Sequence, residues 1–250
     1  MSIRGPYFTI GLWFDQPIFP SALLAVGDVL MAGGGRYDGD VTVGPSDVPF
    51  TYLSDIDDRR SLDRRVVEGT RAGTVEGEVY RLTLRLSVVG EADVHFGRAL
   101  TPVPASGHPV EIDMPAELVS FTQVGPKEGK QVKAQHRGFL RRLKALCVAL
   151  DPAYALMGED IDTPTPAELV SGYDRLGWSP FISHRLAARA ELVEPLTRLA
   201  ARCKLQDWGT GCHYEWVTAR RDRDREALWA ADQAVSVALG RALASSSRVR

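Results

Sequence analysis

The segment 78–89 alternates between apolar and polar residues, and this alternation constrains the fold more than any other feature of the chain. The apolar positions share one parity and are Tyr80, Leu82, Leu84, Leu86 and Val88. The polar positions between them are Arg81, Thr83, Arg85 and Ser87. Because successive side chains of a β-strand point to opposite faces, this pattern predicts a strand that is buried on one face and solvated on the other, as is typical of antiparallel sheets.

A return strand is expected directly after this segment. A turn over 90–93 contains glycine and aspartate, and an apolar pattern resumes over 94–100. If the turn centres on Glu91, Val88 lies opposite Val94, and His95 lies on the solvated face. Because a slip of one residue would exchange the two faces, the observed register tests this interpretation.

The remaining hydrophobic patterns predict strands and helices along the whole chain. Strands are expected over 7–14, 41–43, 50–53, 110–114, 153–157, 181–183 and 212–218. Helices are expected over 20–30, 54–67, 127–150, 165–176, 194–204 and 223–243. We therefore predict an α+β fold, with a mostly antiparallel central sheet and helices packed on one face of it, as a single compact domain. This domain is expected to span 1–244, with a possible internal boundary near 158–166 and a disordered tail over 245–250.

The composition argues against several classes of protein. The 250 residues carry a formal net charge of −2, so the chain lacks the cationic surplus of proteins that grip nucleic acid. No apolar run approaches the ~20 residues of a membrane-spanning helix, and the first residues lack a signal-peptide pattern. The three cysteines are sparse and contain no Cys-x-x-Cys pair, which favours a reducing compartment. We expect a soluble cytoplasmic protein, and the Arg- and Ala-rich usage is typical of a GC-rich bacterial genome.

An Asp-x-Asp pair follows the predicted strand 50–53. This placement of Asp55 and Asp57 resembles the first motif of the haloacid-dehalogenase-like phosphotransferases. The resemblance implies that Asp55 is a nucleophile, that Asp57 is an acid/base, and that both help to hold Mg²⁺, with 158–162 as a later acidic metal motif. It covers a short part of the chain, departs from the family's pattern at Asp58-Arg59, and lacks a separate lysine motif.

The same acids also have a structural interpretation. Ser54 stands where the predicted helix 54–67 begins, and acids in a first turn complement the positive end of a helix. Arg64 and Arg65 complement the negative end in the same way. We favour this interpretation and keep a metal-dependent phosphotransferase or hydrolase that uses Asp55 and Asp57 as an alternative.

Cysteine and histidine side chains offer two other kinds of site. Four candidate zinc ligands lie close in sequence: Cys203, Cys212, His213 and Glu215. Cys212 and His213 are adjacent on a predicted strand and therefore point to opposite faces, with Cys212 expected in the core and His213 on a solvated face. A nucleophilic pair of Cys212 with His184 or His95 would require the fold to bring the two residues together. We predict no catalytic residue, no metal site and no cofactor.

The segment 127–144 is the most basic part of the chain, with seven Lys and Arg residues against Glu128 alone. Its aromatic residue, Phe139, falls on the apolar stripe, so base stacking is not indicated. Such a helix is typical of a surface that meets an acidic protein, and RNA binding through 127–144 is the alternative. Aromatic residues beside turns are further candidate anchors. The candidate partner-binding residues are Lys133, Arg137, Arg141, Arg142, Trp178 and Trp208.

These patterns together favour a non-enzymatic cytoplasmic protein whose task is to bind another protein. The polar residues cap helices, form turns and face solvent, and no reactive cluster stands out. We expect an accessory protein, of the bacterial immunity type that neutralises a toxin, with an acidic partner. Binding to a membrane or to nucleic acid is not expected, and the pattern leaves the oligomeric state open.

Overall fold

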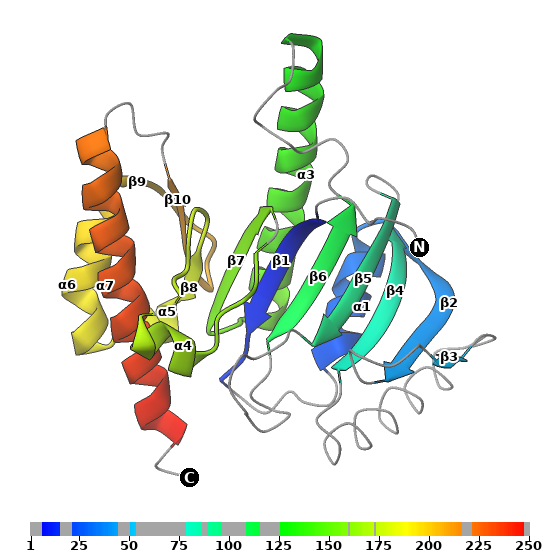
Figure 1. Ribbon diagram of the computed structural model, residues 1–250, viewed down its shortest axis with the longest axis horizontal. Coiled ribbons are helices and arrows are strands. Elements are labelled where there is room, and N and C mark those ends of the chain that lie inside the picture. Colours follow the sequence, from blue (N-terminus) through cyan, green and yellow to red (C-terminus); the bar gives the residue numbers. More distant parts are fainter. Residues whose placement is uncertain are drawn as a thin grey trace.

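The part of the chain that the structure describes is organised around ten β-strands (Figure 1). The computed structural model describes residues 7–15, 22–44, 51–53, 79–86, 90–96, 109–115, 126–159, 161–172, 174–216 and 222–247. The strands within these ranges are β1 (Tyr7–Trp13), β2 (Gly35–Gly44), β3 (Thr51–Leu53), β4 (Val79–Leu86), β5 (Gly90–Phe96), β6 (Val110–Pro115), β7 (Tyr154–Glu159), β8 (Phe181–Ser183), β9 (Cys203–Asp207) and β10 (Gly211–Trp216). The predicted helix 54–67 lies outside the described residues.

All ten strands join one sheet, in the order β3-β2-β4-β5-β6-β1-β7-β8-β10-β9. Each neighbouring pair is antiparallel. The first strand of the chain lies inside the sheet, because β1 pairs with β6 on one side and with β7 on the other. β7 also pairs with β8, so the sheet continues across the segment 158–166. The predicted α+β class, with one compact domain around an antiparallel sheet, is confirmed.

Helices cover both faces of this sheet, which corrects the prediction of a single covered face. One core contains Ile10 and Leu12 of β1 together with Phe139 and Leu143 of a long helix. The two helices on this side are α1 (Ala22–Ala32) and α3 (Pro126–Leu150). The opposite side carries α4 (Pro166–Ser171), α5 (His184–Ala187), α6 (Ala190–Ala200) and α7 (Asp222–Ser247). A second core on that side contains buried residues of α4 to α7.

Burial on both faces is clearest in β7. Tyr154 and Leu156 belong to the second core, whereas Ala155 and Met157 belong to the first, and all four are buried. A continuous apolar run without alternation is typical of a strand that is covered on both sides. The tyrosine hydroxyl donates a hydrogen bond to the carbonyl oxygen of Pro164, so its polar end is satisfied inside the core.

The β4–β5 hairpin keeps the predicted faces but not the predicted register. Val94 pairs with Leu82 rather than with Val88, and residues 90–93 are strand rather than turn. Because this shift is by an even number of residues, Ala92 and Val94 still face the core, where they are buried. His95 lies on the other face and is only 7% exposed, so the prediction that it is solvated is wrong.

Residues typical of helix ends predicted the position of α4, but not the ends of every helix. Thr165 and Glu168 form a capping box at the start of α4, because each side chain accepts a hydrogen bond from the backbone N–H of the other residue. The helix predicted over 194–204 ends instead at Ala200, and residues 203–207 form the edge strand β9. α7 continues to Ser247, past the predicted end of this helix at 243.

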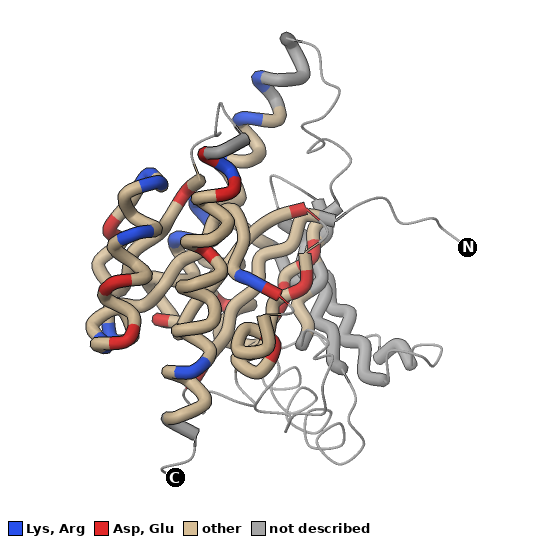
Figure 2. Tube along the Cα trace, turned by 60° about the vertical axis from the view of Figure 1, so that its left-hand side comes forward, with Lys and Arg blue, Asp and Glu red and all other residues tan. Residues whose placement is uncertain are grey.

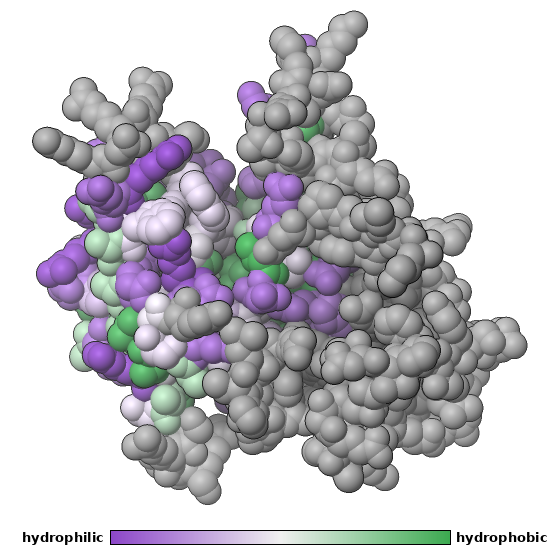
Figure 3. Space-filling view, viewed as in Figure 1, coloured by the Kyte–Doolittle hydropathy of each residue, from purple (hydrophilic) through white to green (hydrophobic). Residues whose placement is uncertain are grey.

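Hydrophilic residues dominate the described surface over α6 and α7 (Figure 3). Between them lie smaller hydrophobic spots, consistent with the exposure of Val193 on α6. None of the described helices combines the length and the hydropathy needed to cross a lipid bilayer.

Candidate functional site

The outer face of α3 carries three of the residues that are predicted to contact a partner. Lys133, Arg137 and Arg141 are exposed, and their spacing of four residues places them on one side of the helix. Lys130 and Lys144 are also exposed and extend the same stripe in both directions. Figure 2 shows basic residues along α3 where this helix projects beyond the sheet.

Acidic residues are missing from the exposed positions of α3 that the structure describes. Apart from the five cations, these positions hold only small apolar residues: Ala134, Ala145, Val148 and Ala149. The five cations take part in none of the ion pairs that join described residues. In a chain with a formal net charge of −2, this stripe is therefore a segregated positive surface.

Arg142 differs from its neighbours on α3. It is half-buried, and its guanidinium donates a hydrogen bond to the carbonyl oxygen of Gly138, at 3.2 Å. Burial lowers the pKa of Arg142, and the adjacent charge of Arg141 lowers it further. Arg142 thus lies at the edge of the basic stripe and is tied to its own helix.

The two tryptophans have different environments. Trp178 is 60% exposed, and its ring packs against Trp216 with a centroid separation of 4.9 Å. Trp208 is buried, and its ring lies between Phe181 and His213. The prediction that Trp208 is an exposed anchor is therefore wrong, since the turn after β9 folds its ring into the first core. Trp178 remains a candidate contact residue.

A histidine, a cysteine and an aspartate converge where α5 meets the β9–β10 hairpin. Nε2 of His184 lies 3.5 Å from Sγ of Cys212 and 3.5 Å from Oδ1 of Asp207. The structure thus brings together Cys212 and His184, whereas His95 lies on β5. Burial raises the pKa of the Cys212 thiol, and the charge of Asp207 adds to this shift.

The zinc ligands that are close in sequence do not gather. His213 is fully buried on the side of Trp208, while Cys212 packs against the second core, so the two side chains point to opposite faces as predicted. The expected solvation of His213 is wrong. Its Nε2 lies 2.7 Å from Oγ of Ser179, and burial lowers its pKa to about 4.

A second polar group lies on the buried face of β1, β5 and β6. Oδ2 of Asp113 lies 2.9 Å from Nε2 of His95, and Oδ1 of Asp113 accepts a hydrogen bond from Thr9. Glu111, on the same face, accepts a hydrogen bond from the backbone N–H of Thr163. Burial raises the pKa of Glu111, and His95 acts in the opposite direction.

The sequence did not predict that these polar side chains lie together in a buried position. The alternation in 110–114 does place Glu111 and Asp113 on one face, but two acids on one strand face indicate solvent rather than burial. Asp113 is satisfied at both oxygens by protein groups, so the arrangement is typical of a polar network that links strands. We interpret it as structural.

The Asp-x-Asp motif cannot be placed, since Asp55 and Asp57 lie outside the described residues. The later acidic segment is described in part. Gly158 and Glu159 end β7, and Asp162 is exposed in the following loop. The phosphotransferase hypothesis therefore stays a prediction from the sequence.

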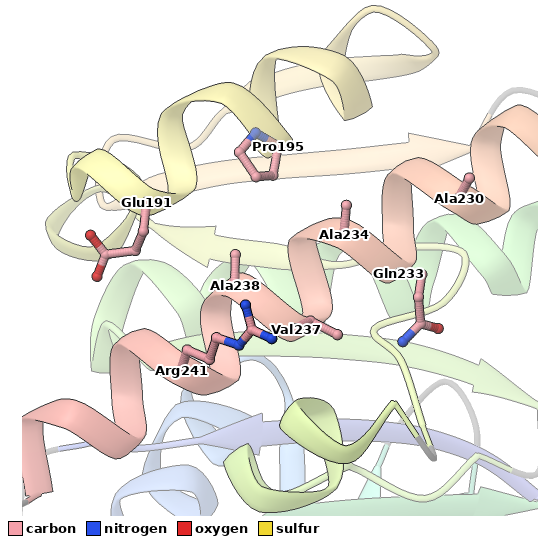
Figure 4. Close-up of a pocket in the computed structure, with 8 residues that line it drawn as sticks. All are labelled: Glu191, Pro195, Ala230, Gln233, Ala234, Val237, Ala238 and Arg241. Carbon is pink, nitrogen blue, oxygen red and sulfur yellow. The ribbon is translucent and has the colours of Figure 1, made fainter.

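Small residues of α7 leave a groove of about 640 Å³ against α6. Figure 4 shows Glu191 and Arg241 toward one end of this groove and Ala230 at the other. Ala234 and Ala238 form its floor on α7, and Pro195 faces them from α6. The residues that line the groove include one carboxylate, Glu191, and no histidine, cysteine or serine.

Comparison with known proteins identifies no family. No family model matches the chain, and no curated protein matches it. Among solved structures, a T6SS protein of Pseudomonas aeruginosa is similar over 92% of this chain and 73% of its own, with a TM-score of 0.45 and 12% sequence identity. Similarity at this level transfers no function to this chain.

Proposed function

We propose that this protein is a non-enzymatic cytoplasmic protein that binds an acidic protein partner through the basic stripe of α3. The stripe consists of Lys130, Lys133, Arg137, Arg141 and Lys144. Its role is that of an accessory protein of the immunity type, which masks the acidic surface of another protein. The observation that carries the proposal is the absence of any acid from the exposed, described positions of α3.

The small residues of the same face support a protein partner. Ala134, Ala145 and Val148 are exposed beside the cations, so another surface can approach the helix backbone closely while the long basic side chains reach its carboxylates. Fields of one sign raise association rates by factors of roughly 10 to 1,000, and this effect falls with ionic strength. We therefore expect rapid and salt-sensitive association.

RNA is the less favoured occupant of this face. Binding to single-stranded nucleic acid normally combines cations with aromatic rings on which bases stack. The exposed, described positions of α3 carry no aromatic residue, and Phe139 is buried in the first core. RNA binding is thus an outcome that the experiment must separate from protein binding.

The test combines site-specific crosslinking with charge reversal. A photo-crosslinking amino acid at Ala134 or Ala145 should capture a protein in the native cell, while the same group at exposed Val193 on α6 should not. The captured protein is then purified, and its affinity is measured by titration. The double variant Arg137→Glu/Arg141→Glu should weaken binding by at least about 10-fold, because it reverses two charges that face the partner.

The matched control is Arg198→Glu/Arg202→Glu. These arginines are also exposed and four residues apart, but Arg198 lies in α6 and Arg202 lies in the turn that follows it. Affinity equal to that of the wild type in this control supports a specific role of α3. Equal weakening in both double variants, unchanged binding in the α3 variant, or a nuclease-sensitive adduct would each contradict the proposal.

A further inference from the structure

We propose that His184, Asp207 and Cys212 form a zinc site, with a fourth coordination position open to solvent. The three residues each offer one ligand atom, and these atoms all lie within 4.8 Å of one another. The group lies at the surface, with the His184 and Asp207 side chains 44% and 65% exposed. This inference is independent of the proposed partner-binding surface.

Regular structure places all three side chains. Asp207 ends β9, and Cys212 lies in β10 directly opposite it in the antiparallel pair. His184 is the first residue of α5, and its backbone N–H donates a hydrogen bond to the carbonyl oxygen of Thr210 in the hairpin turn. The turn that joins β9 to β10 is therefore tied to the segment that carries the histidine.

Neighbouring contacts hold the ligands in position. Ser183 and Arg185, on either side of His184, both bind Asp151, so the backbone at the histidine is fixed from both sides. The Oδ1 atom of Asp207 accepts a hydrogen bond from the backbone N–H of Gly209, at 2.7 Å. Contacts of this kind orient ligands in metal sites before the metal binds.

The two distances from the histidine nitrogen agree with tetrahedral coordination. Zinc binds imidazole nitrogen and carboxylate oxygen at about 2.0–2.1 Å and thiolate sulfur at about 2.3 Å, so tetrahedral angles place N and S roughly 3.5 Å apart and N and O roughly 3.4 Å apart. The observed distances from Nε2 of His184 to Sγ and to Oδ1 are both 3.5 Å. Sγ of Cys212 and Oδ1 of Asp207 lie within 4.8 Å of each other, so the third ligand atom is also close to this position.

A nucleophilic triad would look different. In a Cys-His-Asp triad, the acid binds one ring nitrogen and the thiol faces the other. Here both Cys212 and Asp207 approach the same nitrogen, which carries at most one proton and so cannot make a linear hydrogen bond to both. A cation at the centre satisfies the three groups together.

The ligand chemistry selects the metal. A thiolate with an imidazole favours zinc over magnesium or calcium, which prefer oxygen ligands. Three protein ligands leave one position for water or for a donor from another molecule. The Cys212 thiol loses its proton on binding, and the metal takes its place.

The experiment uses untagged protein, with Zn²⁺ titrated by calorimetry and Co²⁺ as a spectroscopic probe. Wild-type protein should bind one metal ion per chain, and the Co²⁺ form should show the charge-transfer absorption of a thiolate ligand. Cys212→Ser should remove that absorption and weaken Zn²⁺ binding by at least about 100-fold, since changes that only perturb ligand orientation already cost 10- to 100-fold. His184→Ala should weaken binding to a similar extent.

The control is Cys203→Ser, which removes a half-buried thiol from β9 but leaves the three ligands in place. This variant should bind Zn²⁺ and absorb as the wild type does, and circular dichroism checks that each variant is folded. Co²⁺ binding without the thiolate absorption, or equal Zn²⁺ affinity in Cys212→Ser and wild type, would overturn the proposal.

Discussion

Nε2 of His95 lies 2.9 Å from Oδ2 of Asp113, and these two side chains tie β5 to β6 on a face of the sheet that the sequence predicts to be solvated. Thr9 of β1 donates to the other oxygen of Asp113, at 2.7 Å. Three adjacent strands therefore share one carboxylate. Hydrogen bonds to charged groups contribute about 1.5–3 kcal/mol each, and leaving a buried partner unsatisfied adds to the cost of losing them.

We expect Asp113→Ala to lower the free energy of unfolding by about 2–4 kcal/mol, because both Thr9 and His95 lose an acceptor. Urea denaturation measures this change. The control is Asp162→Ala, at an exposed position, where the expected change is within about 0.5 kcal/mol. Similar losses in the two variants would show that the carboxylate does not link the strands.

Because Asp232 is buried, we expect its contribution to the free energy of unfolding to fall as pH rises. This residue of α7 is fully buried and accepts a hydrogen bond from the backbone N–H of Gly177; burial raises its pKa from 3.8 to about 7. Between these two pH values the folded state holds a proton that the unfolded state has released. The contribution of Asp232 to the free energy of unfolding is therefore complete below pH 3.8 and is lost as pH rises to about 7. One pKa unit corresponds to about 1.4 kcal/mol, which gives a loss on the order of 4 kcal/mol.

The variant Asp232→Asn removes this titration. It should be more stable than wild type at pH 8 and similar to it at low pH, in denaturant titrations at both pH values. Asp162→Asn is the matched control at an exposed position and should leave the pH profile unchanged. If the stability of Asp232→Asn depended on pH as that of the wild type does, the prediction would be wrong.

The contribution of His213 to the free energy of unfolding should change with pH in the opposite direction. Burial lowers its pKa from 6.5 to about 4, so the unfolded state binds more protons between these values and stability is lost as pH falls through this range. His213→Phe keeps an aromatic ring beside Trp208 and should abolish this loss, which is on the order of 3 kcal/mol. Denaturant titrations between pH 4 and 7 measure the slope, and an unchanged slope would contradict the prediction.

We expect substitution by alanine to have opposite effects on stability at two glycines that lie in helices. A Cβ at Gly138 of α3 would meet only the flexible Arg142 side chain, at 3.4 Å, so Gly138→Ala should stabilise the protein by about 0.5–1 kcal/mol. A Cβ at Gly240 of α7 would lie 2.6 Å from the carbonyl oxygen of Pro166, so Gly240→Ala should separate α4 from α7 and destabilise the protein. Thermal unfolding of both variants tests these two expectations. Stabilisation by Gly240→Ala as well as by Gly138→Ala would show that α4 and α7 are packed less closely than the structure indicates.

Elements with strong local signals could be predicted from the sequence. The capping box of Thr165 and Glu168 marks the start of α4, and the Asp151-Pro152 pair marks the end of α3 at Leu150. β9 was missed because an edge strand with mostly exposed side chains shows no apolar alternation. The hairpin register was wrong because several registers share the same parity, and periodicity alone cannot choose among them.

The candidate sites could be predicted only in part. The sequence nominates Cys212 and His184 as a pair, but it offers His95 equally, since proximity depends on which strands pair over long distances. Asp207 was not considered, because the sequence predicts a helix up to residue 204 and no strand over 203–207. The basic stripe of α3 follows directly from helical spacing, whereas the burial of Trp208 depends on how the turn after β9 folds back.

The central place of β1 has a consequence for how this chain is made. On the ribosome this apolar strand emerges before both of its neighbours, because β6 begins at Val110 and β7 at Tyr154. At 5–20 residues per second, β1 waits on the order of 10 s before any neighbour exists. During that time its unpaired edges can join other nascent chains, so yield should depend on chaperones that shield a newly made strand, even though both of its edges are paired in the finished sheet.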